Sequence, residues 1–199
     1  MNNTAKKIKD DFTDNINLLI NTSLENNNVA ILPPMDVYNS ANLLKKLGYK
    51  ASLTMIDPWY NKGVGGVRED YVEYIVGILD SAKNLKEKLA QRKLRYMPGP
   101  TSVIEAALRI GFVGKKEQTG HPAQKPVEVY EKLLMMVTKG GDLVIDPMAG
   151  SGTTGVVAKN FGLKAIMCDE SEEYIGIMEK RLNIKRLPIH EEIQFILKL

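Results

Sequence analysis

The chain has 199 residues, of which 44% are hydrophobic and 26% are charged, and this composition suits one soluble globular domain, or one domain with an appended arm. No stretch approaches the roughly 20 consecutive apolar residues that a bilayer-spanning helix needs. The polar start MNNTAKKIKDDF lacks the apolar region of a signal peptide, so we expect a cytoplasmic protein without a membrane anchor.

Cysteine content limits the chemistry further. The single cysteine, Cys168, cannot form an internal disulfide, and no group of Cys and His residues has the spacing of a metal site. We therefore expect no metal.

Charge is distributed unevenly, although the formal net charge is only +3. Residues 83–95, KNLKEKLAQRKLR, carry six basic residues and one acid. Such a run forms either a solvated helix face or a patch that contacts phosphates, and both interpretations stay open. In the second interpretation the contacts would come from Lys88, Arg92, Lys93 and Arg95.

The apolar pattern along the chain predicts helices alternating with strands. The first helix is amphipathic, packs on the domain or on a partner, and ends at the NNN of 26–28. Strands are predicted at 29–32, 51–56, 93–97, 142–145 and 164–168. Further helices are predicted at 39–49, from Glu69, at 101–112, after Lys125 with Pro126 in its first position, at 153–161, and after the cap residue Ser171. This alternation predicts an α/β sandwich, a parallel sheet with helices on both faces, whose ligands lie beyond the carboxyl ends of the strands.

A glycine-rich loop follows the predicted strand at 142–145. The sequence DPMAGSGTTG (146–155) contains Gly150, Gly152 and Gly155 in a G-x-G-x-x-G pattern. It lacks the lysine of a phosphate-cradling P-loop, which disfavours a nucleoside triphosphate. Tight turns of an α/β fold without a ligand are the plainer interpretation.

Two acids flank this loop in a way that disfavours a dinucleotide. Asp146 ends its strand, and three residues separate it from Gly150, so that a carboxylate stands where it would repel a pyrophosphate. The same carboxylate would suit a cofactor with an ammonium group, such as the methionine end of S-adenosylmethionine. Asp169 ends the next strand, where it can accept hydrogen bonds from both ribose hydroxyls.

Three motifs together, DPWY (57–60), HPAQKP (121–126) and DPMAGSGTT (146–154), resemble those of the amino-methyltransferases of nucleic acids. Their order resembles the circularly permuted beta group of DNA methyltransferases, which modify adenine N6 or cytosine N4. The likeness is strong over 121–182, fair over 28–78, weak over 83–120, and absent from 1–27 and after 183.

This resemblance implies a Rossmann-like methyltransferase fold and S-adenosylmethionine as the cofactor. It implies a catalytic domain at 28–199 without an evident target-recognition domain, preceded by a helical arm at 1–27. The implied cofactor pocket contains Asp146, Pro147, Ala149, Gly150, Ser151, Gly152, Thr153 and Asp169, with His121, Gln124, Lys125 and Pro126 closing over the methionine moiety.

The resemblance makes DPWY the catalytic motif, and its residues suit that role. The Asp57 carboxylate and the Pro58 carbonyl can accept the hydrogens of an exocyclic amino group, so that its nitrogen turns toward the methyl donor. Tyr60 stands at the family's position for stacking on a flipped base. Methylation at cytosine carbon 5 is disfavoured, because it needs a cysteine nucleophile and Cys168 lies on a different strand.

The chain departs from the family pattern at two places. Trp59 replaces a second proline, which frees one backbone dihedral. It either adds a second surface for stacking on a base or marks a weak or inactive relative. Met148 stands where an aromatic residue is common. Only 60 residues separate Tyr60 from His121, so a module for reading bases is not evident there. Target choice is then loose or depends on a homodimer or a separate specificity subunit.

Four functions remain open. The leading hypothesis is a DNA amino-methyltransferase of a restriction-modification type, acting on adenine N6 in preference to cytosine N4. An RNA amino-methyltransferase and a non-catalytic, cofactor-binding subunit are the alternatives, and a nicotinamide dehydrogenase is more distant because it would leave DPWY without a role.

Overall fold

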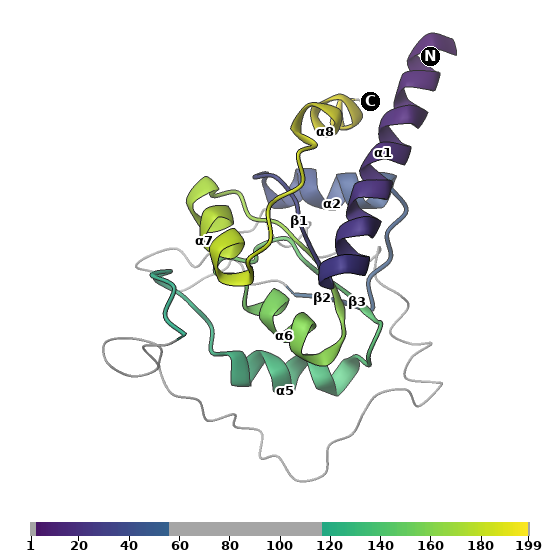
Figure 1. The fold of residues 1–199 in the computed structure, drawn as a ribbon. Coiled ribbons are helices and arrows are strands. Elements are labelled where there is room, and N and C mark those ends of the chain that lie inside the picture. Colours follow the sequence, from purple (N-terminus) through teal and green to yellow (C-terminus); the bar gives the residue numbers. More distant parts are fainter. Residues whose placement is uncertain (1–2, 56–116, 199) are drawn as a thin grey trace, which may run out of the picture.

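The computed structural model describes residues 3–55 and 117–198 (Figure 1). The elements predicted from Glu69, at 93–97 and at 101–112 lie outside the described residues, as do the DPWY motif and the basic run at 83–95. No helix in the described part is long and apolar enough to cross a bilayer.

Four parallel strands form one sheet in the order β1-β4-β3-β2. Their bounds are Val29–Ile31 for β1, Leu53–Thr54 for β2, Leu143–Asp146 for β3 and Lys164–Met167 for β4. In the two central strands Asp146 lies opposite Met167. The carboxyl ends of β3 and β4 therefore meet at the same edge, as the sequence predicted for its two acids.

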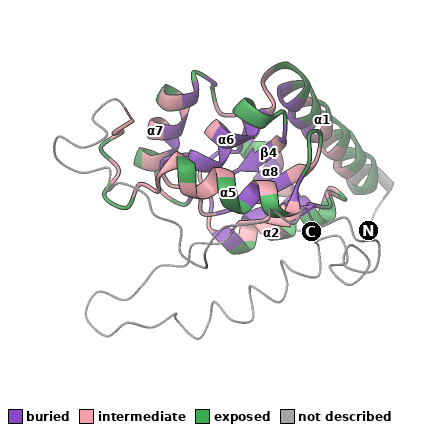
Figure 2. Ribbon diagram, turned by 90° about the horizontal axis from the view of Figure 1, so that it is seen from below, coloured by how far each residue is buried: buried purple, intermediate pink, exposed green. Residues whose placement is uncertain are grey.

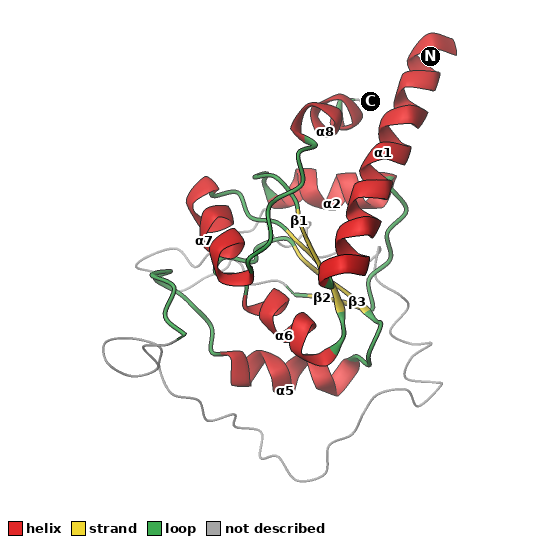
Figure 3. Ribbon diagram, viewed as in Figure 1, coloured by secondary structure: helices red, strands yellow, loops and turns green. Residues whose placement is uncertain are grey.

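Apolar residues occupy both faces of the sheet, which is why these strands lack the alternation of a half-exposed sheet. On β1, Val29 and Ile31 point to one side, whereas Ala30 and the following Leu32 point to the other, and all four are fully buried. Each face needs a cover of helices, and Figure 3 shows the resulting three layers.

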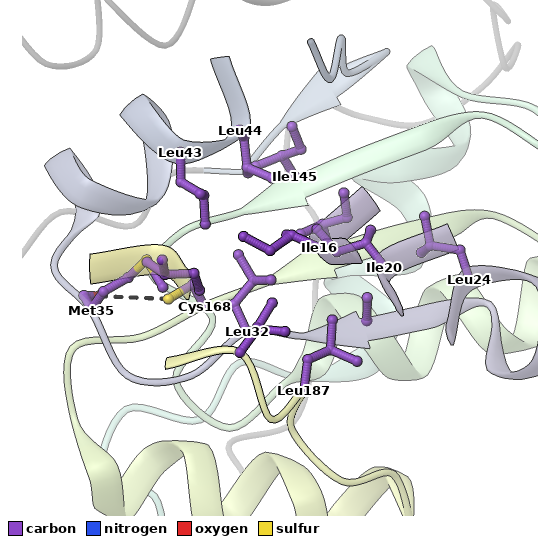
Figure 4. Close-up of a cluster of buried hydrophobic side chains, with 14 of the residues drawn as sticks. Ile16, Ile20, Leu24, Leu32, Met35, Leu43, Leu44, Ile145, Cys168 and Leu187 are labelled. Carbon is purple, nitrogen blue, oxygen red and sulfur yellow. Dashed lines mark hydrogen bonds between the residues drawn. The ribbon is translucent and has the colours of Figure 1, made fainter. Parts of the chain in front are cut away.

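One face is covered by α1 (Asn3–Asn27), α2 (Val37–Lys46) and α8 (His190–Leu197) (Figure 1). The second half of α1 contributes Ile16, Ile20 and Leu24 to this core (Figure 4). The other side of the same helix is exposed (Figure 2), so α1 is amphipathic as predicted and packs on the sheet of its own chain.

The opposite face is covered by α5 (Val127–Val137), α6 (Thr153–Phe161) and α7 (Glu172–Leu182). Here α6 approaches β4 closely: a Cβ added at Gly155 would come within 2.7 Å of Met167 Cε. A side chain at this position would push the helix away from the sheet.

Local sequence signals set several helix ends. Ser171 caps α7 by accepting from the amide of Tyr174, as predicted, and Asp36 caps α2 through the amide of Asn39. The predicted bounds of α6 agree with the structure. Pro126 was predicted as the first residue of α5. It is instead the N-cap, so the helix begins one residue later than predicted.

No helix or strand was predicted for the chain after α7. There the amide of Leu187 donates to the Ile31 carbonyl at 2.8 Å, which covers part of the exposed edge of β1, and α8 then packs against α1 and α2. The rings of Phe12 and Phe195 meet edge to face with centroids 5.2 Å apart. A two-turn helix gives too short a period to be recognised in a sequence.

We expect Ile20→Ala to lower the free energy of unfolding by about 2–5 kcal/mol, because it leaves a cavity where α1 meets the sheet. The matched control is Leu18→Ala on the same helix, whose side chain is 64% exposed and whose loss should change stability by less than about 0.5 kcal/mol. Urea denaturation of both variants measures the difference. Equal effects would show that α1 is not part of the cooperatively folded core.

Candidate functional site

The predicted cofactor residues gather where β3 and β4 end. The loop from Pro147 to Gly152 leaves β3 and enters α6 directly, and the chain after β4 runs beside it. The amide of Cys168 donates to the Asp146 carbonyl, and the amide of Ala149 donates to the Cys168 carbonyl, both at 2.9 Å. These two hydrogen bonds extend the parallel ladder beyond the strands and fix the loop against the neighbouring chain.

Asp146 lies beneath the loop and is 4% exposed. Its Oδ2 accepts a short hydrogen bond from Thr154 Oγ1, and its Oδ1 accepts from the amide of Met148 at 3.2 Å. The carboxylate therefore ties the start of the loop to the first turn of α6. Its low exposure places a negative charge where solvent screens it little.

Asp169 holds the same loop from the other strand. Its Oδ2 accepts from the amide of Gly150 at 2.9 Å, and its Oδ1 accepts from the amide of Ser171 at 3.0 Å. Asp169 is 8% exposed, whereas its neighbour Glu170 is exposed to solvent. Each oxygen of Asp169 keeps a second acceptor site for a further donor.

Two glycines let the backbone make this turn. Gly150 has φ of 50° and Gly152, the N-cap of α6, has φ of 76°, a region that residues with side chains rarely adopt. A Cβ at Gly150 would lie 2.9 Å from Nε2 of His121. The loop thus depends on glycine both for its conformation and for the close approach of the HPAQKP segment.

The HPAQKP segment covers the loop, and Gln124 holds that segment together. Gln124 Oε1 accepts from the amide and the hydroxyl of Thr119, and its Nε2 donates to the Glu117 carbonyl at 2.6 Å. At the end of the segment, Thr153 Oγ1 donates to the Lys125 carbonyl at 3.0 Å. HPAQKP and the glycine loop therefore lie side by side, as predicted. The side-chain amide of Gln124 bonds to Thr119 and Glu117, which come just before HPAQKP.

His121 lies between this segment and α7. Its Nδ1 accepts from the amide of Ala123 at 3.1 Å, so in the neutral ring the hydrogen is on Nε2, the atom nearest Gly150. The His121 ring lies 4.2 Å from the Tyr174 ring, centroid to centroid. Tyr174 was placed in the first turn of its helix from the sequence, without a role in the site.

Arg181 is a further site residue that the sequence did not indicate. Its Nη1 donates to the carbonyl and the hydroxyl of Ser151 at 3.0 and 3.1 Å, and to Thr153 Oγ1 at 3.0 Å. Burial lowers the pKa of Arg181, and the charge of Glu117 acts in the opposite direction. The available signal was the seven-residue spacing from Tyr174, which places both side chains on the same face of α7.

Cys168 is next to Asp169 in the sequence, but its side chain lies in the core that α1, α2 and α8 cover. Its Sγ lies 3.4 Å from the Pro33 carbonyl and 3.6 Å from the Met35 carbonyl (Figure 4). Burial raises the pKa of this thiol far above its usual range, so it is not an activated nucleophile. In the described part of the chain, no group of three or more His, Cys, Asp and Glu residues could hold a metal.

The structure does not describe every predicted site residue. Asp57, Pro58, Trp59, Tyr60, Lys88, Arg92, Lys93 and Arg95 lie outside residues 3–55 and 117–198. The described chain reaches Met55, whose amide donates to the Ile145 carbonyl at 2.9 Å. Because β2 runs parallel to β3, Met55 lies at the same edge of the sheet as the glycine loop.

The structure is thus an α/β fold with a glycine loop between two strand-end acids, at the edge of the sheet where open parallel sheets place their ligands. Residues 108–180 match the family described as DNA methylase, of the N6 and N4 type. The predicted resemblance to the amino-methyltransferases is confirmed by this match.

Two relatives each match about a third of the chain. The type II methyltransferase M2.LlaDCHI of Lactococcus lactis subsp. cremoris is 51% identical over 63 residues, which are 32% of this chain and 23% of that protein. The type II methyltransferase M2.DpnII of Streptococcus pneumoniae is 50% identical over 62 residues, 31% of this chain and 23% of that protein. The matched segment is thus less than a quarter of either relative.

Solved structures extend the likeness to the fold. The crystal structure of the M1.HpyAVI-SAM complex superimposes with a TM-score of 0.56 at 18% identity, covering 78% of this chain and 100% of that chain. The crystal structure of M1.HpyAVI alone gives a TM-score of 0.51 at 18% identity. The predicted methyltransferase fold, with its parallel sheet and helices on both faces, is confirmed.

The buried thiol predicts a dependence of stability on pH. Because the pKa of Cys168 is raised in the folded protein, the unfolded chain releases this proton above about pH 8.5 while the folded protein keeps it. Stability from this group is therefore present below that pH and is lost as the pH rises. Urea denaturation should show a fall of about 1 kcal/mol between pH 8.5 and 9.5.

Cys168→Ala is the control for this prediction, since it removes the titrating group. The variant should be less stable throughout and should lose most of the decrease between the two pH values. An identical decrease in both proteins would assign the pH dependence to other groups.

Proposed function

We propose that this chain binds S-adenosylmethionine at the carboxyl edge of its sheet and transfers the methyl group to an exocyclic amino group of a DNA base, with adenine N6 preferred to cytosine N4. The observation that carries the proposal is the hydrogen bond from the amide of Gly150 to Asp169, which joins the glycine loop to the acid of the next strand. One solved structure with this fold is named as a SAM complex.

The groups at this edge suit the two ends of the cofactor, the nucleoside and the amino acid. On the nucleoside side, Asp169 has acceptor sites left for ribose hydroxyls, and Glu170 is a second acid within reach of solvent. On the amino-acid side, α6 begins at Thr153 and presents its free amides, which suit a carboxylate. Asp146 beneath the loop favours a positive charge nearby. When bound, S-adenosylmethionine supplies a methyl group made electrophilic by its sulfonium.

The proposed chemistry then belongs to DPWY. Asp57 and the Pro58 carbonyl accept hydrogens of the target amino group, and Tyr60 stacks on the base, with Trp59 as a second stacking surface. The basic residues Lys88, Arg92, Lys93 and Arg95 contact backbone phosphates without reading sequence. In this proposal residues 28–199 form the catalytic domain and 1–27 the helical arm.

DNA is preferred as substrate over RNA because the matched relatives are named type II methyltransferases. A role in restriction-modification and a location in the cytoplasm are further parts of the proposal. Because no module for reading bases is evident in the 60 residues between Tyr60 and His121, the proposal assigns sequence recognition to a homodimer or a separate specificity subunit. A non-catalytic, cofactor-binding subunit is the second candidate, and it is motivated by Trp59.

The direct test is transfer of tritiated methyl groups to DNA and RNA in parallel, followed by mass spectrometry of the digested nucleosides. We expect N6-methyl-2′-deoxyadenosine from DNA, and we expect Asp57→Ala to lower transfer by at least about a hundredfold while cofactor affinity changes little, since this acid acts on the base. Binding of S-adenosylmethionine without transfer to either nucleic acid would favour the non-catalytic subunit, and equal activity of Asp57→Ala would contradict the mechanism.

A second prediction separates the two adjacent acids. Asp169→Asn should weaken binding of S-adenosylhomocysteine by about tenfold or more, because it removes the charge that holds the Gly150 amide and the ribose. Glu170→Gln, at the exposed neighbour, is the matched control and should change the dissociation constant less than about twofold. Calorimetric titration measures both. A larger loss in Glu170→Gln would make Glu170 the ribose acceptor.

A further inference from the structure

Arg181 connects α7 to the turn that leads into α6. A single nitrogen, Nη1, lies 3.0 Å from the Ser151 carbonyl, 3.1 Å from Ser151 Oγ and 3.0 Å from Thr153 Oγ1. Both hydroxyl-bearing residues are buried, at 3% exposure each. The guanidinium therefore determines where this turn lies, while the hydroxyl hydrogen of Thr153 goes to the Lys125 carbonyl.

Arg181 is partly desolvated at this position. Burial lowers its pKa, and its hydrogen bonds to Ser151 and Thr153 replace part of the lost hydration. The charged group facing it is Glu117, at the start of the segment that covers the loop. Arg181 thus lies between the glycine loop and the segment that closes over it.

The glycine loop is held at two separate points. Its first half is fixed through Gly150 by Asp169, the proposed ribose acid. Its second half, Ser151 to Thr153, is fixed by Arg181 and by the Lys125 carbonyl. In the proposed orientation of the cofactor, this second half faces the amino-acid end, because α6 begins there.

We propose that Arg181 is a positioning residue for the amino-acid end of the cofactor, acting through Ser151 and Thr153 and not by contact with the nucleoside. The inference rests on the proposed function, since it assumes that S-adenosylmethionine is the ligand. Arg181 holds Ser151 and the first amides of α6 in the orientation that receives the amino-acid group. The nucleoside end is independent of Arg181 because Asp169 fixes it separately.

Calorimetric titration with two probes tests this division. S-adenosylhomocysteine carries both the nucleoside and the amino-acid part, whereas 5′-methylthioadenosine carries the nucleoside alone. Arg181→Met should weaken S-adenosylhomocysteine on the order of tenfold to a hundredfold, the effect of losing charged hydrogen bonds, and should change 5′-methylthioadenosine less than about twofold. Arg181→Lys keeps the charge but not the planar group, so it should give an intermediate loss.

Lys180→Met is the matched control, because it removes a charge from the exposed face of the same helix. It should leave both affinities unchanged. Circular dichroism checks that each variant is folded at the temperature of titration, and Arg181→Lys provides the comparison if Arg181→Met is not.

The outcomes separate this inference from the proposed function. If the unmodified protein binds both probes and the Arg181 variants lose both to the same degree, or lose neither, the inference is wrong and the proposed function stands. If the unmodified protein binds neither probe, the proposed function fails and the inference fails with it. Selective loss of S-adenosylhomocysteine supports both.

Discussion

Two buried carboxylates at the ends of adjacent parallel strands hold the glycine loop from opposite sides. Asp146 bonds to the amide of Met148 and the hydroxyl of Thr154, and Asp169 bonds to the amides of Gly150 and Ser171. Charges with so little exposure are tolerated only when their hydrogen-bonding capacity is used. The loop is therefore shaped by these acids, and its conformation depends in turn on glycines that accept positive φ.

The rest of the fold serves this arrangement. Register between β3 and β4 pairs Asp146 with Met167 and so brings the two acids to one edge. The helices on the two faces of the sheet differ in what they contribute. α1, α2 and α8 complete a core, whereas α6 and α7 also supply Thr154, Tyr174 and Arg181 to the site.

The sequence was most informative where periodicity and residue type agreed. Predicted and observed bounds coincide for α6, and the cap at Ser171 was correct, because glycines and a capping serine act locally. The paired acids were found for the same reason: each ends an apolar run.

Gln124 was predicted beside the cofactor, and the structure shows its side chain bonded to residues just before HPAQKP. Arg181 could not be found, since its partners lie 28 and 30 residues away.

The central claim is that the edge carrying Asp146, the glycine loop and Asp169 is the cofactor site. Hydrogen–deuterium exchange of the full chain, with and without S-adenosylhomocysteine, tests it without relying on activity. We predict slower exchange for the amides of 149–154 and 169–171 and for the segment 117–126, with little change in α8. Protection confined to other parts of the chain, or none at saturating ligand, would contradict this account.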